Sequence, residues 1–170
     1  MSEANKKITV EECTEEVKLM ARRLGLLHYY FSQAIVDRLG EEEGKALIKE
    51  AVWAYGQHCG QAVREGVEAM GLPLTEENYG KVRDLPRYGW ESDTVTLDSG
   101  EERPIVTFCP VAATLKELGP RGMELGHLYC YVDQAKYEAY NPDMEFIHTK
   151  NVLDGDACCE FLIQPAESSE

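Results

Sequence analysis

The sequence predicts an α+β fold, in which an antiparallel sheet made of two hairpins packs against a helical layer. Apolar residues recur at helical spacing over residues 9–70. Two pairs of short β-rich segments follow, within 90–108 and within 144–164, and each pair flanks a turn. A second helical pattern, over 110–140, separates the two pairs. Helices and strands are therefore segregated along the chain, which is typical of α+β proteins.

The first helical segment is marked by an N-terminal cap. Thr9 followed three residues later by Glu12 is the capping-box pattern, which predicts that a helix begins here. Apolar residues then continue at helical spacing. Gly25 predicts an interruption, after which a second helix ends at Gly40.

A third, long helix is predicted over residues 42–70, with Gly71 just beyond its end. Gly56 and Gly60 lie four residues apart within it and share one face. Because glycine costs helix stability, another part of a protein must approach this backbone closely. That neighbour is usually another helix, and one interpretation is that the glycine face serves a homodimer.

The strands and the remaining helices are each bounded by turn residues. "WESDTVTL" and "RPIVTF" flank "DSGEE" and predict the first hairpin. Helices are predicted over 110–118 and 121–140, the second ended by Pro142. "MEFIHTK" and "ACCEFLIQ" flank the turn "LDGD" and predict the second hairpin. Alternation places Cys159 and His148 on inward faces of their strands.

Length and charge limit the classes of protein to consider. A chain of 170 residues predicts a single domain over 1–170, with frayed tails at 1–8 and 165–170. The net charge of −14 argues against a nucleic-acid partner or an anionic membrane surface. No apolar signal segment and no membrane span is recognisable, so we expect a cytoplasmic protein with six reduced cysteines.

Cys109 is the first candidate for chemistry. It follows the apolar run "PIVTF" and precedes Pro110, which suits the first position of a helix. Cys109 is therefore the expected N-cap, where free amides and the helix dipole favour a thiolate and lower the pKa. The alternatives are a metal ligand or a small side chain that fills a strand–helix corner.

Asp133 is the second candidate. It interrupts an aromatic stripe formed by Tyr129, Tyr137 and Tyr140 on the same helix. Burying a carboxylate on such a face is costly unless it is paired or used, so Asp133 is a candidate for proton transfer. The alternative is a salt bridge to Lys136, which would turn the carboxylate toward water.

The histidines are weaker candidates. His58 lies near the glycine pair, His127 lies three residues before Cys130, and His148 shares a strand face with Phe146. Each is more often a structural side chain than a base or ligand. No pair of CxxC motifs is present, so no structural zinc is predicted. A three-ligand metal site is an alternative, with the side chains Cys109, His148 and Cys159.

Four fragments in this order resemble one known family. "FCP", "YCYVD", "YNP" and "LDGDACCEF" are similar to the L-2-amino-thiazoline-4-carboxylic acid hydrolase family over residues 108–163. The closing fragment also resembles the vinyl-4-reductase ligand-binding domain, which is related to the transport-particle-component fold. That second resemblance implies a sheet with helices packed on one face.

The first resemblance implies a hydrolase, without a cofactor or metal, that opens a cyclic C=N bond in a small, sulfur-containing substrate. Cys109 would attack the amidine-like carbon, Asp133 would move protons, and Asn141 would stabilise charge. In an alternative, Asp133 activates water directly. The side chains expected to contact substrate are Tyr129, Asn141, His58, Cys159 and His148.

The second resemblance implies a competing function, a non-catalytic module that binds or senses a small molecule. In the sensing relatives a zinc is held near this turn by cysteines and an acid. Cys159 fits that pattern, but His148 and Asn151 stand where the acid and a second cysteine are expected. Since Asn151 is a poor zinc ligand, we expect no metal here.

Overall fold

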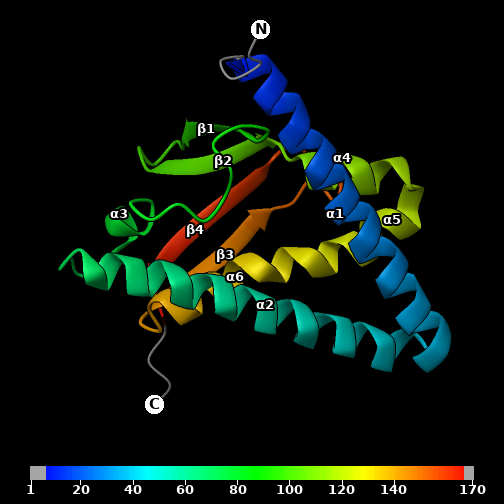
Figure 1. The fold of residues 1–170 in the computed structure, drawn as a ribbon. Helices are drawn as coiled ribbons and strands as arrows, with labels where there is room; N and C mark the ends of the chain where they lie inside the picture. Colours follow the sequence, from blue (N-terminus) through cyan, green and yellow to red (C-terminus); the bar gives the residue numbers. More distant parts are fainter. Residues whose placement is uncertain (1–6, 167–170) are drawn as a thin grey trace, which may run out of the picture.

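Two long helices meet at Gly40 and diverge across a β-sheet (Figure 1). They are α1 (Val10–Leu39) and α2 (Glu41–Ala69) in a computed structural model that describes residues 7–166. The predicted tails lie mostly outside the described residues, although the last strand continues through Pro165. Gly40 has a φ of 88°, a backbone conformation that favours glycine and allows the sharp reversal between the helices.

The sheet has four antiparallel strands in the order β1-β2-β4-β3. Each predicted hairpin forms, and β2 pairs with β4 to join them. The predicted α+β class is therefore confirmed, while the likeness to the vinyl-4-reductase domain stays a prediction. The strands are β1 (Glu91–Thr96), β2 (Glu102–Phe108), β3 (Met144–Lys150) and β4 (Cys159–Pro165).

The helices between the hairpins are shorter than predicted. A 3₁₀ turn divides the segment that was expected to form one helix over 121–140. The chain changes direction at this turn and continues as a second, separate helix. Within residues 7–166 no helix is long and apolar enough to cross a membrane. The elements are α3 (Glu76–Tyr79), α4 (Pro110–Glu117), α5 (Gly119–His127), η1 (Leu128–Cys130) and α6 (Tyr131–Tyr140).

The start of α1 follows the prediction, but its predicted interruption is wrong. The Thr9 hydroxyl accepts from the Glu12 amide at 3.1 Å, and the Glu12 carboxylate accepts from the Thr9 amide at 2.9 Å. Gly25 is buried within a continuous helix, where a Cβ would lie 3.4 Å from the Val111 carbonyl oxygen. A Cβ at this position would make an ordinary contact with α4, so Gly25 packs against α4 within the helix and does not end it.

The glycines of α2 face α6 of the same chain. A Cβ on Gly56 would lie 2.6 Å from the carbonyl oxygen of Val132, and one on Gly60 would overlap the carbonyl of Lys136. The expected close neighbour is thus a helix, as predicted. The interpretation that this face serves a homodimer is wrong, because α6 already occupies it.

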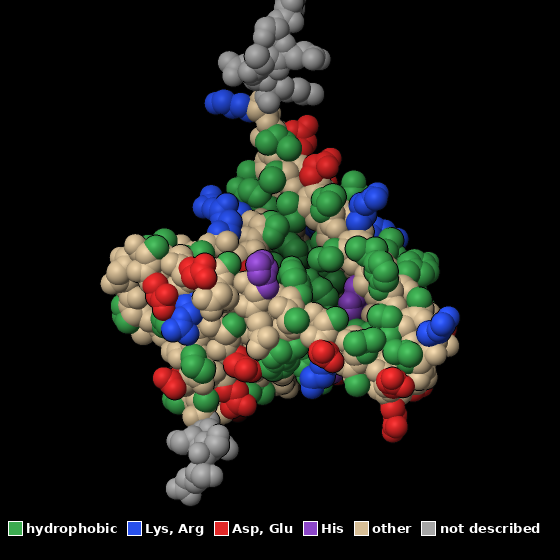
Figure 2. Space-filling view, turned by 60° about the horizontal axis from the view of Figure 1, so that its bottom comes forward, with side chains coloured by type: hydrophobic (Ala, Val, Ile, Leu, Met, Phe, Trp, Pro, Cys, Tyr) green, Lys and Arg blue, Asp and Glu red, His purple; other side chains and the backbone are tan. Residues whose placement is uncertain are grey.

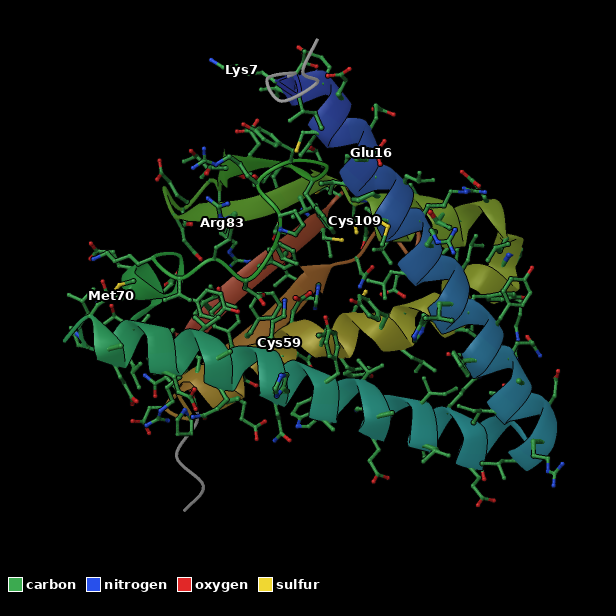
Figure 3. All side chains as sticks on the ribbon, in the orientation of Figure 1. Lys7, Glu16, Cys59, Met70, Arg83 and Cys109 are labelled. Carbon is green, nitrogen blue, oxygen red and sulfur yellow. The ribbon has the colours of Figure 1, made fainter. Side chains whose placement is uncertain are left out.

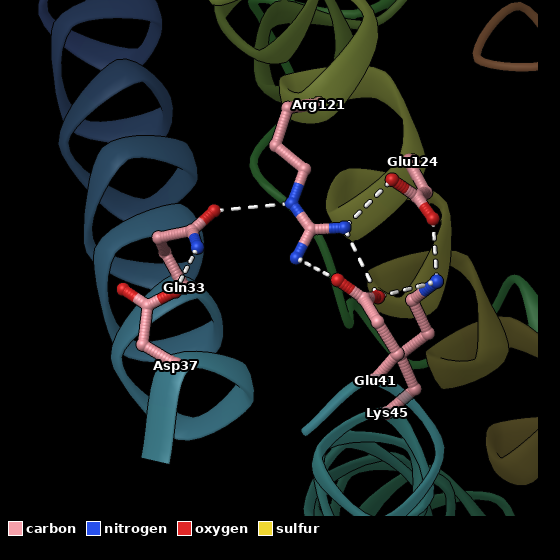
Figure 4. A network of polar contacts seen from close by, with 6 residues as sticks. All are labelled: Gln33, Asp37, Glu41, Lys45, Arg121 and Glu124. Carbon is pink, nitrogen blue, oxygen red and sulfur yellow. Dashed lines mark hydrogen bonds and ion pairs between the residues drawn. The ribbon is translucent and has the colours of Figure 1, made fainter. Parts of the chain in front are cut away.

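A polar network joins α1, α2 and α5 near the junction of the long helices (Figure 4). Arg121 donates to Gln33 at 3.1 Å, to Glu41 at 2.8 Å and to Glu124 at 2.8 Å. Lys45 pairs with Glu41 at 2.9 Å and also with Glu124. These groups lie near the surface, so the network orients the helices more than it stabilises the fold.

The two faces of β4 differ in chemistry, as strand alternation predicts. Cys159 and Phe161 point toward the helices. Glu160 points away and pairs with Lys150 at 2.7 Å and with Arg103 at 3.3 Å. The inward face is therefore the apolar one, and it borders the space beneath the helices.

We expect Gly60→Ala to lower the free energy of unfolding by about 1–3 kcal/mol, because its Cβ would overlap the α6 backbone. This cost opposes the gain in helix propensity of about 1 kcal/mol. Urea unfolding followed by circular dichroism measures the change. Gly80→Ala is the matched control, since Gly80 has a φ of −70° and open space around it. Equal stability of the two variants would contradict the close α2–α6 contact.

Candidate functional site

A cavity of about 880 Å³ lies between the helices and the inward face of the sheet. Its wall is made by α1, the segment before β1, α4, η1, α6, the inward residues of β2, β3 and β4 and the segment between β3 and β4, with single residues from α2, α3 and α5. Most of the lining side chains are hydrophobic. The space-filling view shows hydrophobic side chains gathered around a hollow between the long helices (Figure 2). The volume falls in the range of about 300–1,000 Å³ that is typical of small-molecule sites.

Five of the seven predicted site residues line this cavity. They come from four places that are separated along the chain: the β2–α4 junction, η1 with α6, β3, and β4. The fold thus brings the two main candidates to one space, together with three of the five predicted contact residues. The five side chains are Cys109, Tyr129, Asp133, His148 and Cys159.

The other two predicted residues do not line this cavity. His58 is exposed on α2 and does not line the cavity. The Asn141 side chain donates to the Leu74 carbonyl at 2.8 Å and accepts from the Asp143 amide at 2.9 Å. Asn141 therefore ends α6 and ties it to the segment before α3, because its amide is satisfied by backbone groups.

Cys109 is the N-cap of α4, as predicted, and its Sγ accepts from the Ala112 amide at 3.5 Å. Its side chain lies between α1 and the sheet (Figure 3). Burial nevertheless raises the pKa of the Cys109 thiol, although the Ala112 and Val111 amides and the Trp90 indole oppose the rise. The predicted fall in pKa is therefore wrong, because loss of water outweighs the helix N-terminus.

Three further thiols line the same cavity, those of Cys13, Cys130 and Cys159. Burial raises the pKa of both Cys130 and Cys159, and the charge of Asp133 raises each further. Cys159 is buried and its Sγ accepts from the Val152 amide at 3.5 Å. All four cysteines that line the cavity, Cys13 included, are free thiols, and burial favours the protonated form of Cys109, Cys130 and Cys159.

Asp133 makes the salt bridge to Lys136 that the sequence left as an alternative, and it also lies near His148. Its carboxylate lies 3.5 Å from the Lys136 ammonium and 3.7 Å from Nε2 of His148. Lys136 also pairs with Asp84 at 2.6 Å. Burial lowers the pKa of Lys136, but Asp133 and Asp84 raise it more, so Lys136 stays charged. The salt bridge does not turn Asp133 outward, because Lys136 is itself buried.

His148 is a neutral imidazole at neutral pH. Burial lowers its pKa, and the carboxylate of Asp133 opposes part of that shift. A neutral imidazole beside a carboxylate is able to accept a proton and share the resulting charge. The Asp133–His148 pair is therefore a carboxylate–imidazole arrangement on the cavity wall.

Asn151 is a functional candidate that the sequence analysis missed. It is 2% exposed, and its Oδ1 accepts from the Leu153 amide at 2.9 Å. Its Nδ2 has no hydrogen-bond partner among the described residues, and Asn151 lines the cavity. A buried amide N–H without a partner is costly, so a ligand acceptor or water is expected there. The sequence analysis considered Asn151 only as a poor zinc ligand.

Aromatic rings form one wall of the cavity. Tyr79 stacks on Tyr137 at 4.4 Å between centroids, and Tyr137 stacks on Phe146 at 4.8 Å. Phe146 in turn lies 5.0 Å from Phe161. Tyr140 leaves the predicted stripe, because its hydroxyl donates to a backbone carbonyl at 2.9 Å in a separate core cluster. A row of rings suits a flat, apolar part of a ligand.

The alternative metal site does not form. Within residues 7–166 no three side chains of His, Cys, Asp or Glu are placed to share a metal ion. Cys109, His148 and Cys159 line one cavity without making such a group. The cavity therefore offers thiols, a carboxylate–imidazole pair and an amide donor as its chemical groups.

We expect Cys109 to react with iodoacetamide with an apparent pKa above that of N-acetylcysteine in the same buffer, because burial disfavours the thiolate. Peptide mapping by mass spectrometry over a series of pH values gives the profile. A Cys109 profile below that of the free thiol would contradict the balance between burial and the helix N-terminus.

We expect His148 to make the protein less stable in acid. Its pKa is lowered in the folded state, so the unfolded chain binds the proton more readily. The contribution of His148 is complete above about pH 6.5 and is lost as the pH falls through its folded pKa. Urea unfolding at pH 7.5 and 5.5 should show a smaller loss for His148→Gln than for the original protein. His58→Gln, at an exposed position, is the control and should behave as the original.

Comparison with known proteins bears on this site. No curated protein and no solved structure matches the chain. Residues 4–163 match the family model described as L-2-amino-thiazoline-4-carboxylic acid hydrolase, which extends the resemblance from residues 108–163 to the N-terminal helices. Since this match includes α1, α2 and every residue lining the cavity, the chain belongs to the L-2-amino-thiazoline-4-carboxylic acid hydrolase family.

Proposed function

We propose that the protein is a hydrolase that opens the ring of a small cyclic amidine, with Cys109 as nucleophile and Asp133 in proton transfer. Membership of a hydrolase family supports the reaction class. One observation carries the assignment of residues: the N-cap thiol of α4 and the Asp133–His148 pair line the same cavity. A nucleophile and a base within one enclosed space are the parts that covalent catalysis requires.

The first step forms a bond between Sγ of Cys109 and the carbon of the C=N bond. Because the resting thiol is protonated, its proton leaves as the bond forms and passes to the Asp133–His148 pair. The ring nitrogen takes up a proton from that pair, which gives a neutral tetrahedral intermediate. Amides at the start of α4 lie beside the sulfur and favour negative charge there.

The second step breaks the ring bond between the same carbon and the ring sulfur. The departing sulfur takes a proton, and an isothiourea remains attached to Cys109. Water then adds to the isothiourea carbon, with its proton accepted by the Asp133–His148 pair. Loss of Cys109 as the thiol gives a carbamoyl group on the former ring nitrogen, so one water is consumed in each cycle.

Asn151 takes the role that the sequence analysis gave to Asn141. Asn151 lines the cavity and its buried Nδ2 has no hydrogen-bond partner among the described residues, whereas both polar atoms of the Asn141 amide are used in the fold. A donor held in place by burial stabilises charge without first having to reorganise. We therefore assign Asn151 Nδ2 to an acceptor atom of the substrate or intermediate.

A second candidate function is a binding or sensing module for a small molecule. The size and hydrophobic lining of the cavity favour it, since these suit retention of a ligand as well as its conversion. In this function Cys109 only shapes the wall, and the raised pKa of its thiol agrees with that role.

We expect Cys109→Ser and Asp133→Asn each to reduce turnover by about 10²–10⁴-fold, as is usual for loss of a nucleophile or a proton-transfer group. Turnover is measured as release of free thiol from 2-aminothiazolines that carry different groups at ring position 4. Cys158→Ser and Asp143→Asn are matched controls, because neither residue lines the cavity. Full turnover by both site variants would refute the proposed residues.

Mass spectrometry of acid-quenched reactions separates the two chemical routes. Covalent attack predicts an isothiourea adduct on Cys109 during turnover, at the mass of the whole substrate. Turnover without an adduct, together with an active Cys109→Ser variant, would favour direct activation of water by Asp133. Binding of the compounds without turnover would favour the binding module.

A further inference from the structure

The charges that line the cavity are unbalanced. Three carboxylates line it, from Glu16, Asp84 and Asp133, against the single ammonium of Lys136. Among the described residues no arginine and no second lysine lines the wall. The remaining titratable base, His148, is neutral because burial lowers its pKa. The cavity is therefore negatively charged at neutral pH.

Lys136 is not free to bind an anion. Its ammonium lies 2.6 Å from Asp84 and 3.5 Å from Asp133, and both pairs are partly withdrawn from water. A ligand carboxylate would have to displace one of these carboxylates or remain close to two like charges. Burying an unpaired carboxylate is among the most costly events in binding. The cavity therefore disfavours binding of a free carboxylate such as that of the compound after which the family is named.

The size of the cavity also disfavours a small, charged ligand. A five-membered ring with one carboxyl group fills only a small part of 880 Å³. The remainder is bounded by hydrophobic side chains and by the stacked rings of Tyr79, Tyr137 and Phe146. Apolar surface of this extent rewards a ligand that covers it, at about 25 cal/mol per Å². A small, charged heterocycle leaves most of it uncovered.

Asn151 adds a buried amide to the cavity wall, close to the sulfur of Cys130. Its Nδ2 is buried and lacks a partner, so it selects a ligand with a neutral acceptor such as an amide oxygen or a ring nitrogen. The cavity has space for an apolar group and a donor for one acceptor. These two features favour a ligand with one polar end and one aromatic or aliphatic end.

We infer that the cavity accepts an uncharged or cationic, largely apolar ligand, and that the substrate is a cyclic amidine carrying an apolar group in place of a free carboxylate. The ligand class follows from the charge, volume and lining of the cavity. Its identity as a cyclic amidine rests on the proposed function.

Binding of three probes tests this inference. They are 2-amino-thiazoline-4-carboxylate, its N-methylamide and its N-benzylamide, which separate removal of the charge from addition of an apolar group. The protein carries Cys109→Ser to prevent turnover and Trp53→Phe to leave Trp90, which lines the cavity, as its single tryptophan. Quenching of Trp90 fluorescence reports binding, and calorimetry on the same samples provides a second reading.

We expect the N-methylamide to bind about tenfold more tightly than the free acid, since the like charge is removed. The N-benzylamide should bind about a further tenfold more tightly, since the phenyl ring covers apolar surface. A free acid that binds as tightly as the N-methylamide would overturn the inference. So would an N-benzylamide with no advantage, or the failure of all three probes to bind.

Charge variants test the cause of the preference. Asp84→Asn should improve binding of the free acid by about three- to tenfold and leave the N-methylamide within about twofold. Glu16→Gln, at an exposed position on the cavity wall, tests the same effect without touching the Lys136 pairs. Asp98→Asn, in the exposed β1–β2 turn, is the matched control and should change neither affinity. An unchanged preference in both site variants would remove electrostatics as its cause.

Turnover of the same probes by protein with Cys109 intact separates the two proposals. If the amides bind most tightly and are hydrolysed, the ligand class and the reaction both stand. If they bind most tightly and no ring is opened, the ligand class stands and the hydrolase proposal fails. If the free acid binds most tightly and is hydrolysed, the reaction stands and the inferred ligand class fails.

Discussion

The close approach of α2 and α6 is the constraint on which the site depends. Gly56 and Gly60 remove two side chains from α2, so that the α6 backbone lies directly against it. With one side of α6 fixed in this way, its other side turns Asp133 and Tyr137 toward the sheet. A side chain at either glycine would overlap the backbone of α6, the helix that carries Asp133. The two glycines lower the helix propensity of α2, but they allow the close contact that positions α6 at the site.

Burial decides the electrostatics of that site. Cys109 lies at a helix N-terminus, which favours a thiolate, but its enclosed position favours the neutral thiol more strongly. The same loss of water keeps His148 neutral, while Lys136 stays charged because two carboxylates lie beside it. Burial therefore favours the neutral form of both the Cys109 thiol and the His148 imidazole.

Local signals predicted well wherever the cause of a structure is itself local. The capping box of Thr9 fixes the start of α1, Pro110 fixes the start of α4, and strand alternation turns Cys159 inward. Predictions failed where a contact with a segment distant in the sequence determines the local structure. Gly25 does not interrupt α1, because it lies against α4. Asn141 does not reach the cavity, because backbone groups far away in the sequence satisfy its amide.

The sequence by itself determined the order of elements, the two hairpins, the N-cap position of Cys109 and the family of the chain. These follow from periodicity, capping and motifs, which act over a few residues. Only the tertiary structure decided that five predicted residues share one cavity, that His58 faces outward and that Asn151 has a free donor. It also decided the protonation of Cys109, because the pKa of a thiol depends on the water removed by segments that the local sequence does not contain.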